Sequence, residues 1–287
     1  MPTENPLTIF GDISKPATVL IEKVAEALGG YFKPYQIKRV ARAQAEAEII
    51  KAQGQIDVTD LHRRAIARFV AEEARNQNNI ESITEQAIPQ LEDSAKPQDV
   101  DDDWITNFFD KCRIVSDDQM QSLWAKVLAG EANSPGSFSK RTVNFLGSLD
   151  KVDADLFTSL CGFGWLVGEV VPVVFDVLEP IYNKKGIDFS SLSHLDDIGL
   201  VSFNNIRVSL LELPKRITIS YYGTPLNLEF TKQQGNDLDI GNVLLTKTGQ
   251  QLFTICGSKP VDGFVDYVIP HWAKKGTILS SPYQVKK

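Results

Sequence analysis

The stretch DDDWITNFFDKCRIVSDDQMQSLWAKVLAGEANSPGSFSKRTVNFLGSLDKVDADLFTSLCGF, residues 101–163, decides the fold. Its apolar residues recur at intervals of three and four, which is the spacing of one face of an α-helix. The spacing predicts four short helices in a row. We expect the first over Trp104–Cys112, the second from Ser116 to Gly130, the third from Ser137 or Ser139, and the fourth from Asp150. At the start of the second helix, Ser116 and Gln119 predict a capping box.

The inward faces of these four helices are rich in large apolar side chains. Each such side chain contributes roughly 1.5 to 3 kcal/mol when it is buried. The sequence therefore predicts a compact central bundle. Its expected core residues are Trp104, Ile105, Phe108, Phe109, Cys112, Met120, Leu123, Trp124, Val127, Leu128, Val143, Leu146, Leu149, Leu156, Phe157 and Leu160.

Composition narrows the class of protein. The 287 residues suffice for two or three domains, and the net charge of -7 argues against a general nucleic-acid coat. Cys112, Cys161 and Cys256 are widely spaced in apolar sequence, which is typical of buried thiols in a reducing cytoplasm. The first ten residues lack the pattern of a secretory signal, and no window has the roughly 20 apolar residues of a spanning helix. We therefore expect a cytoplasmic protein.

The chain opens with an amphipathic segment. Ser14 and Pro16 predict a helix start, and Gly29 with Gly30 predicts its end. The apolar side either packs on the next helix or contacts a membrane surface as a peripheral anchor. Packing is favoured, because the polar side has no excess of basic residues. The candidate membrane contacts are Ile9, Phe10, Val19, Leu20, Val24 and Leu28.

A long helical region follows from Pro34, is weakened at Gly54, and restarts near Asp60 with Ile66, Phe69 and Val70 on one apolar stripe. Its alanine-rich composition predicts strong helix with a thin apolar face, either as an antiparallel hairpin or as one rod. Residues 35–90 are therefore our candidate for self-association into a homo-oligomer. Four arginines at helical spacing could instead form a phosphate-binding edge, although nearby acids favour a mixed, solvated face. These are Arg63, Arg64, Arg68 and Arg75.

Beyond residue 163 the pattern changes from helical to alternating. Ser190 or Ser191 is the expected cap of a helix that carries Leu192, Leu195 and Ile198. Candidate strands are 170–177, 206–211, 217–222, 226–230 and 243–245, with a polar loop expected over residues 231–239. The order of helices and strands resembles a winged-helix domain. The candidate nucleic-acid contacts here are Lys184, Lys185, Arg207, Lys215 and Arg216. However, residues 164–287 hold 12 basic and 12 acidic residues, so this region has no general attraction for phosphate.

Several short sequence motifs occur in the chain in a fixed order. They include Asp103-Trp104-Ile105-Thr106-Asn107-Phe108-Phe109, Leu123-Trp124-Ala125-Lys126-Val127-Leu128-Ala129-Gly130-Glu131 and Cys256-Gly257-Ser258-Lys259-Pro260-Val261. With them, nearly the whole chain resembles a bacterial family catalogued as domain of unknown function 2806. The central helices are also similar to abortive-infection alpha-type proteins. The resemblance implies a cytoplasmic bacterial protein of defence-associated neighbourhoods, without catalytic residues to carry over.

The sequence shows no clear catalytic or metal-binding motif. His62, His194 and His271 have no partner at metal-ligand spacing, and Asp101–Asp103 is better read as a helix cap than as a cation site. We therefore expect no enzyme activity, no cofactor and no metal. The predicted fold is mainly α with a C-terminal α+β part, in domains 1–95, 96–163 and 164–287. The predicted function is a non-enzymatic defence sensor or effector that binds a protein partner or itself; the alternative is a winged-helix nucleic-acid-binding regulator.

Overall fold

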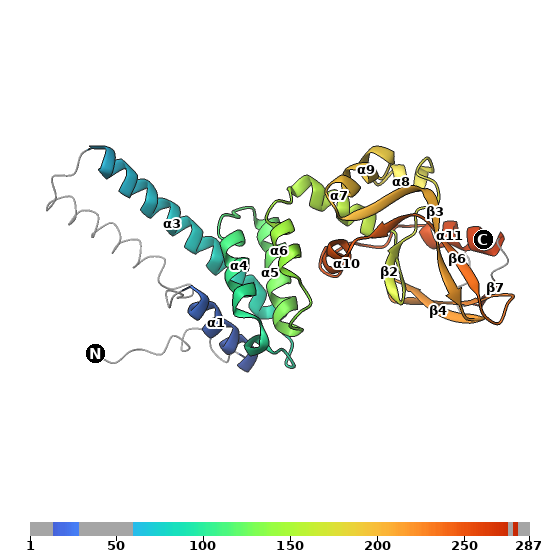
Figure 1. Ribbon diagram of the computed structural model, residues 1–287, viewed down its shortest axis with the longest axis horizontal. Helices are drawn as coiled ribbons and strands as arrows, with labels where there is room; N and C mark the ends of the chain where they lie inside the picture. The colour runs from blue at the N-terminus through green and yellow to red at the C-terminus, as the bar shows by residue number, and fades with distance from the viewer. Residues whose placement is uncertain (1–13, 29–59, 275–277, 281–287) are drawn as a thin grey trace. The chain divides into compact units, whose positions relative to one another are not determined.

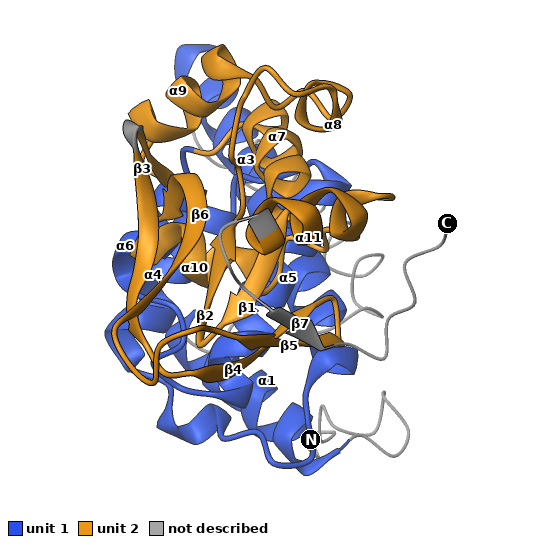
Figure 2. Cartoon of the chain, turned by 90° about the vertical axis from the view of Figure 1, so that its right-hand side faces the viewer, with its two compact units in different colours: residues 1–148 blue, residues 149–287 orange. Residues whose placement is uncertain are grey.

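The computed structural model describes residues 14–28, 60–274 and 278–280. The chain is a mixed α+β protein that divides into two compact units, residues 1–148 and 149–287 (Figures 1 and 2). The described part of the first unit is helical, and the second combines helices with antiparallel sheets. The single division falls between Ser148 and Leu149, whereas the sequence predicted two divisions, after residues 95 and 163.

The first unit contains α1 (Lys15–Ala27), α3 (Asp60–Ala87), two 3-10 turns, η2 (Ile88–Gln90) and η3 (Pro97–Asp99), and then α4 (Asp102–Cys112), α5 (Asp118–Asn133) and α6 (Lys140–Leu146). Its core is aromatic. The ring of Phe108 lies 5.2 Å from that of Trp104 and 5.1 Å from that of Trp124, and all three side chains are buried. Such pairs are worth about 0.5–1.5 kcal/mol beyond their buried area. The predicted helix over Trp104–Cys112 is confirmed.

The boundaries of α5 differ from the prediction at both ends. The N-cap is Asp117, whose carboxylate accepts from the backbone N–H groups of Gln119 and Met120, both at 3.0 Å. The expected cap, Ser116, instead accepts a hydrogen bond from the Asn79 side chain. Gly130 does not end the helix, which continues to Asn133. Its missing side chain makes room for the Phe138 ring, since a Cβ there would lie 2.7 Å from that ring.

The segment between α3 and α4, which the sequence predicted as an acidic domain boundary, is packed into the first unit. Pro97 and Val100 are buried, and the Lys96 amide donates to the Ala132 carbonyl at 2.8 Å. The C-terminal half of α3 lies against α5 through buried amides. Gln121 of α5 donates to Asn79 of α3 at 3.2 Å and to the Val115 carbonyl at 2.9 Å. Because buried amides need matched partners, this contact fixes the position of α3.

The second unit contains α7 (Lys151–Cys161), β1 (Gly164–Val167), β2 (Glu169–Pro172), α8 (Pro180–Asn183), α9 (Phe189–Asp197), β3 (Val201–Leu213), β4 (Arg216–Tyr221), β5 (Thr224–Glu229), β6 (Asn236–Leu245), α10 (Lys247–Phe253), α11 (Phe264–Lys274) and β7 (Ile278–Ser280).

One antiparallel sheet of the second unit has the order β2-β1-β4-β5-β7, and β3 pairs with β6 in a second sheet. Val174 bridges the end of β2 to Gly241 of β6. Trp165, Trp272 and Phe264 fill the core.

Several features of the second unit depart from the sequence prediction. α7 was assigned to the central bundle, but its Asp153 bonds His194 of α9 at 2.7 Å. The cap of α9 is Asp188, which forms a reciprocal pair with Ser191. β6 begins at Asn236, where a polar loop was expected. The Asn236 amide donates to the carbonyls of Leu213 and Lys232, and Asp239 accepts from the Gly241 amide, so these polar side chains have partners inside the fold. α11 was not predicted; Pro270 interrupts its pattern.

Candidate functional site

Two carboxylates are buried among the described residues, one in each unit. Glu131 is 3% exposed and Asp239 is 5% exposed. A buried charge costs free energy unless it is paired or hydrogen-bonded. The partners of each carboxylate therefore show whether it has a structural role or is available to a ligand.

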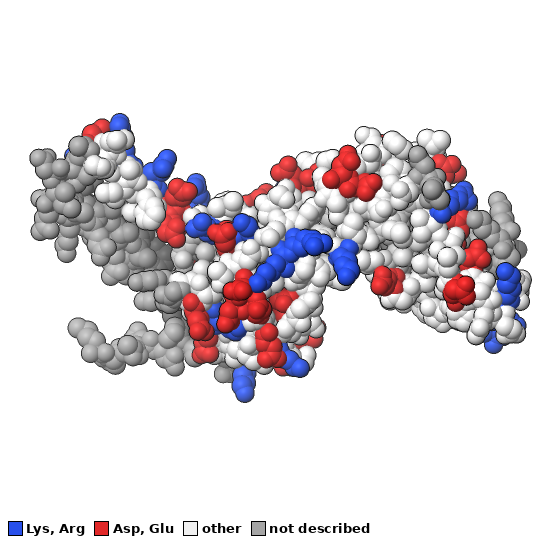
Figure 3. All heavy atoms as spheres, viewed as in Figure 1, with Lys and Arg blue, Asp and Glu red and all other residues white. Residues whose placement is uncertain are grey.

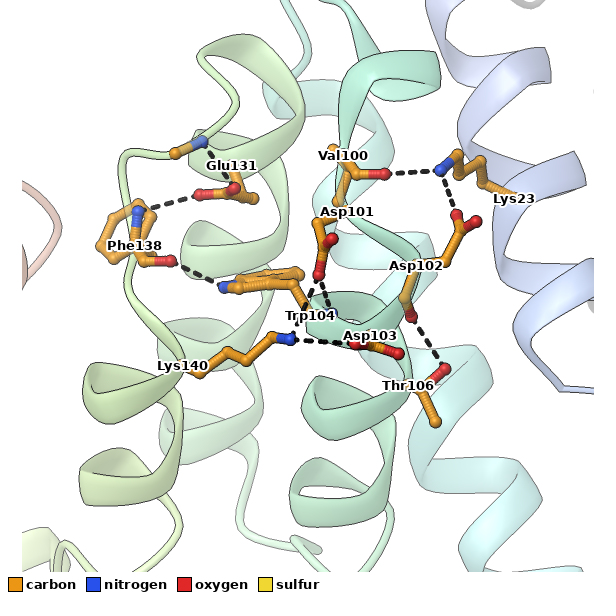
Figure 4. Close-up of polar contacts among 11 residues, drawn as sticks. Lys23, Val100, Asp101, Asp102, Asp103, Trp104, Thr106, Glu131, Phe138 and Lys140 are labelled. Atoms are coloured by element: carbon orange, nitrogen blue, oxygen red, sulfur yellow. Dashed lines mark hydrogen bonds and ion pairs between the residues drawn. The ribbon is translucent and has the colours of Figure 1, made fainter.

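Glu131 holds the turn between α5 and α6 (Figure 4). Its Oε1 accepts from the Gly136 amide at 2.7 Å and its Oε2 accepts from the Phe138 amide at 2.8 Å. Burial raises the pKa of this carboxyl, and the amide hydrogen bonds oppose that shift only in part. The Phe138 carbonyl in turn accepts from the Trp104 indole at 2.7 Å. The two carboxylate oxygens therefore join α5 to the turn, and the Phe138 carbonyl joins the turn to α4.

The acidic triplet at the start of α4 is also paired within the first unit (Figure 4). Asp101 accepts from the Trp104 amide at 2.8 Å, and Lys140 lies 3.2 Å from Asp101 and 3.6 Å from Asp103. The amide of Trp104 and the Lys140 ammonium together lower the pKa of Asp101. Lys23 of α1 bonds both Asp102 and the Val100 carbonyl. The triplet caps α4 as expected, and within the described residues no His, Cys, Asp and Glu side chains group as metal ligands.

The apolar face of α1 lies against α4 and η3 in the first unit. Leu20 and Val24 are fully buried, Val19 and Leu28 are half-buried, and Lys23 supplies the polar anchor described above. These candidate membrane residues therefore serve the core here, so contact with a membrane requires α1 to leave its site. The remaining two, Ile9 and Phe10, lie outside the described residues. No helix in the described part of the chain is long and apolar enough to cross a bilayer.

In the second unit, Asp239 of β6 draws together residues from three elements. Its Oδ1 accepts from the Gly241 amide at 2.9 Å, while its Oδ2 lies 3.2 Å from Arg207 of β3 and 3.6 Å from Nε2 of His271 of α11. The His271 ring stacks on Phe175, with the ring centroids 3.7 Å apart. The neighbouring Trp272 indole donates to the Asp239 carbonyl at 2.8 Å. One acid thus joins β3, β6 and α11.

Sequence reasoning missed the group formed by Asp239, Arg207 and His271. Asp239 was placed in a loop, and the two partners are 32 residues away on either side along the chain. The alternation in Asp237-Leu238-Asp239-Ile240 was the available signal for a strand. An acid beside an imidazole can act as a general base only if the imidazole also reaches a substrate. Here the acid bonds an amide and a guanidinium, so we read the group as a connection between elements.

Most of the predicted nucleic-acid contacts are ion-paired with acids of the chain. Arg63 and Arg64 lie 4.0 and 3.3 Å from Asp60, Arg207 pairs with Asp239, and Lys215 and Arg216 lie 3.6 and 3.2 Å from Glu229. Arg68, Lys184 and Lys185 are exposed, and in the part of the chain that the structure describes they form no ion pair with an acid. The face drawn in Figure 3 accordingly mixes basic with acidic side chains.

The N-terminal half of α3 carries three exposed apolar side chains. Leu61 is 66% exposed, Ile66 48% and Phe69 68%. This half extends past α4, α5 and α6, whereas the C-terminal half is packed on α5 (Figure 1). We call the group Leu61, Ile66 and Phe69 the apolar face of α3. The sequence placed Ile66 and Phe69 on a helical stripe, but it could not show that this stripe is left uncovered while the later part of the helix is buried.

The model of the family described as "Protein of unknown function (DUF2806)" matches residues 63–269. The chain belongs to this family. The DUF2806 match begins within α3 and ends within α11, so it includes elements of both units, the Glu131 turn and the Asp239 group. No curated protein and no solved structure matches the chain.

Proposed function

We propose that this DUF2806 protein is a non-enzymatic bacterial defence sensor or effector that works through protein contacts, and that it self-associates through the apolar face of α3. The exposure of Leu61, Ile66 and Phe69 on a helix whose other half is packed is the observation that carries the proposal. The defence setting rests on the resemblance that we propose between the central helices and abortive-infection alpha-type proteins, and the proposed location is the cytoplasm.

The three side chains share one side of the helix. At 3.6 residues per turn, successive residues are about 100° apart, so Leu61, Phe69 and Ile66 fall within an arc of roughly 140°. Large apolar groups that share a face in this way usually mark an interaction surface. Isolated helical segments are also only marginally stable in water, which gives this half of α3 a reason to pack against a partner.

A second copy of the chain fits this face by shape. If two α3 helices pair antiparallel about an axis near Ala65, Leu61 of each copy lies opposite Phe69 of the other, and the two small Ala65 side chains face each other at the centre. Large apolar side chains that flank small ones in this way let two helices pack closely along one seam. We therefore propose a symmetric dimer, the commonest form of homo-oligomer.

The mass of the chain in solution tests the dimer. We expect light scattering during size-exclusion chromatography to give twice the chain mass at micromolar concentration, and the double variant Ile66→Glu/Phe69→Glu to give the monomer mass. Ala67→Glu is the matched control, since Ala67 is exposed on the opposite side of α3. A monomeric wild-type chain, or a double variant that stays dimeric, would exclude this interface.

The defence role has a separate test. In bacteria that carry the gene in its natural neighbourhood, we expect phage plating efficiency to fall, and the Ile66→Glu/Phe69→Glu variant to restore it while Ala67→Glu does not. Recovery of a phage or host protein with the tagged chain from infected cells would identify the trigger. Unchanged plating for the wild-type gene against a broad phage panel would contradict the defence role.

The alternative function, a winged-helix nucleic-acid regulator, draws on the second unit. The order α8, α9, β3 and β6, with the Val174–Gly241 bridge beside the β3–β6 pair, supports the proposed winged-helix likeness. The ion pairs of Arg207, Lys215 and Arg216 count against phosphate binding. A gel shift with random duplex decides: binding at micromolar concentration that falls steeply as salt rises would favour the alternative.

A further inference from the structure

Two of the three cysteines lie together in the second unit. Cys161 is the last residue of α7 and is buried, and Cys256 follows α10 and is half-buried. Burial raises the pKa of the Cys161 thiol, and the nearby Cys256 thiol raises it further. The residues are about 95 positions apart along the chain, so their meeting is a product of the fold.

The backbone around both cysteines is held in place by side-chain hydrogen bonds. The Tyr222 hydroxyl lies 3.1 Å from the Cys161 carbonyl and 2.6 Å from the Ser258 hydroxyl, so it bridges the two segments. Thr158 of α7 also lies 3.5 Å from the Cys256 carbonyl. Gly162, the residue after Cys161, packs closely on the segment after Cys256. A Cβ at Gly162 would lie 3.1 Å from both the Lys259 carbonyl oxygen and the Val261 side chain. The two segments are therefore positioned side by side from several directions.

We propose that Cys161 and Cys256 are an oxidation site, at which a peroxide converts the two thiols into a reversible disulfide. Cys256 reacts first because its side chain is partly exposed: its sulfur takes one oxygen from hydrogen peroxide, giving a sulfenic acid and one water. The buried Cys161 sulfur then attacks the Cys256 sulfur, the S–O bond breaks, and the oxygen leaves as a second water with the Cys161 proton. Two thiols and one peroxide thus give one disulfide and two waters.

The disulfide would connect the end of α7 to the segment after α10. A bond that closes a loop of about 95 residues strongly restricts the unfolded chain. We therefore expect oxidation to raise the Tm of the second unit by roughly 5 to 15 °C. This inference is independent of the proposed function, since the cysteines lie in the second unit and the apolar face of α3 lies in the first.

Intact-mass measurement and peptide mapping test the proposal on the full chain. After stoichiometric hydrogen peroxide at low protein concentration, we expect a mass loss of about 2 Da, the two thiol hydrogens. We also expect a linked peptide that contains Cys161 and Cys256, and reversal by a dithiol reductant. Cys256→Ser should abolish the change, whereas Cys112→Ser, which alters a buried thiol of the first unit, should leave it intact.

The peptide map of the wild-type chain is decisive by itself, so the test does not depend on how well a variant folds. A gain of one or more oxygens at Cys256 without the linked peptide would overturn the proposal. So would a disulfide that joins two chains through Cys256, or an unchanged mass at a peroxide concentration that oxidises a control thiol.

Discussion

At the scale of single residues, Gly130 sets two effects against each other. A helix-interior glycine normally gains about 1 kcal/mol when replaced by alanine. The Cβ of alanine at this position would lie 2.7 Å from the buried Phe138 ring, and such overpacking costs about 1–3 kcal/mol. We expect the steric cost to win, so that Gly130→Ala lowers the urea midpoint. Gly147→Ala is the control, because its Cβ would make only ordinary contacts at 3.4 Å.

Glu131 predicts a particular dependence of stability on pH. Because its pKa is raised in the fold, the folded chain holds this proton more tightly than the unfolded chain does. The resulting stabilisation is complete below the ordinary glutamate pKa of 4.5 and is lost as the pH rises through the raised value. Because glutamine does not titrate, the free energy of unfolding of Glu131→Gln minus that of wild type should rise as the pH increases from about 4 to about 7. Urea unfolding at several pH values in that range measures this difference.

The control for Glu131→Gln is Glu72→Gln, which removes one charge from the exposed part of α3. If both variants change with pH in the same way, the burial of Glu131 is not the cause. The same outcome would also contradict the idea that burying the charged carboxylate of Glu131, which binds the turn between α5 and α6, costs stability.

At the scale of elements, the start of α5 distinguishes the structure from the sequence prediction. Asp117 accepts two backbone amides there, so Asp117→Ala should destabilise the chain by about 1 kcal/mol, within a range of about 0.5–2. Thermal unfolding measures the loss. Gln119→Ala tests the capping box expected with Ser116, and we predict little change from it. A larger loss from Gln119→Ala than from Asp117→Ala would restore the sequence-based cap.

The sequence predicted the elements whose apolar face meets the core, and it failed where a contact between distant segments decides. α4 and α6 appear where helical spacing placed them, with Ser139 as the cap of α6. α5 continues past Gly130, where the missing side chain makes room for the ring of Phe138, eight residues further along the chain and outside the helix. The Asp239 group likewise depends on β3, β6 and α11 coming together. Local propensity carries no information about such contacts.

At the scale of the whole molecule, the division at residue 148 makes a prediction about cooperativity. Each unit has its own buried core, and compact units often open independently. We expect Gly130→Ala to speed amide hydrogen exchange within residues 60–148 and to leave the β3–β6 amides unchanged. Asp239→Asn should do the reverse, because it weakens the contacts of β6. Equal acceleration in both regions would show that the two units unfold as one.

The approach of Val174 to Gly241 has a consequence for tolerance of substitution. At Gly241 a Cβ would lie 1.8 Å from the Val174 carbonyl oxygen, and its φ of 93° disfavours any side chain. At Gly136, Gly168 and Gly223 the φ is also positive, but no neighbouring atom lies within 4 Å of the added carbon. In a library that samples every amino acid, asparagine should survive selection at those three sites, whereas position 241 should accept glycine alone. Among the described glycines that we compare, the position least tolerant of substitution would then be one that contributes no side-chain functional group.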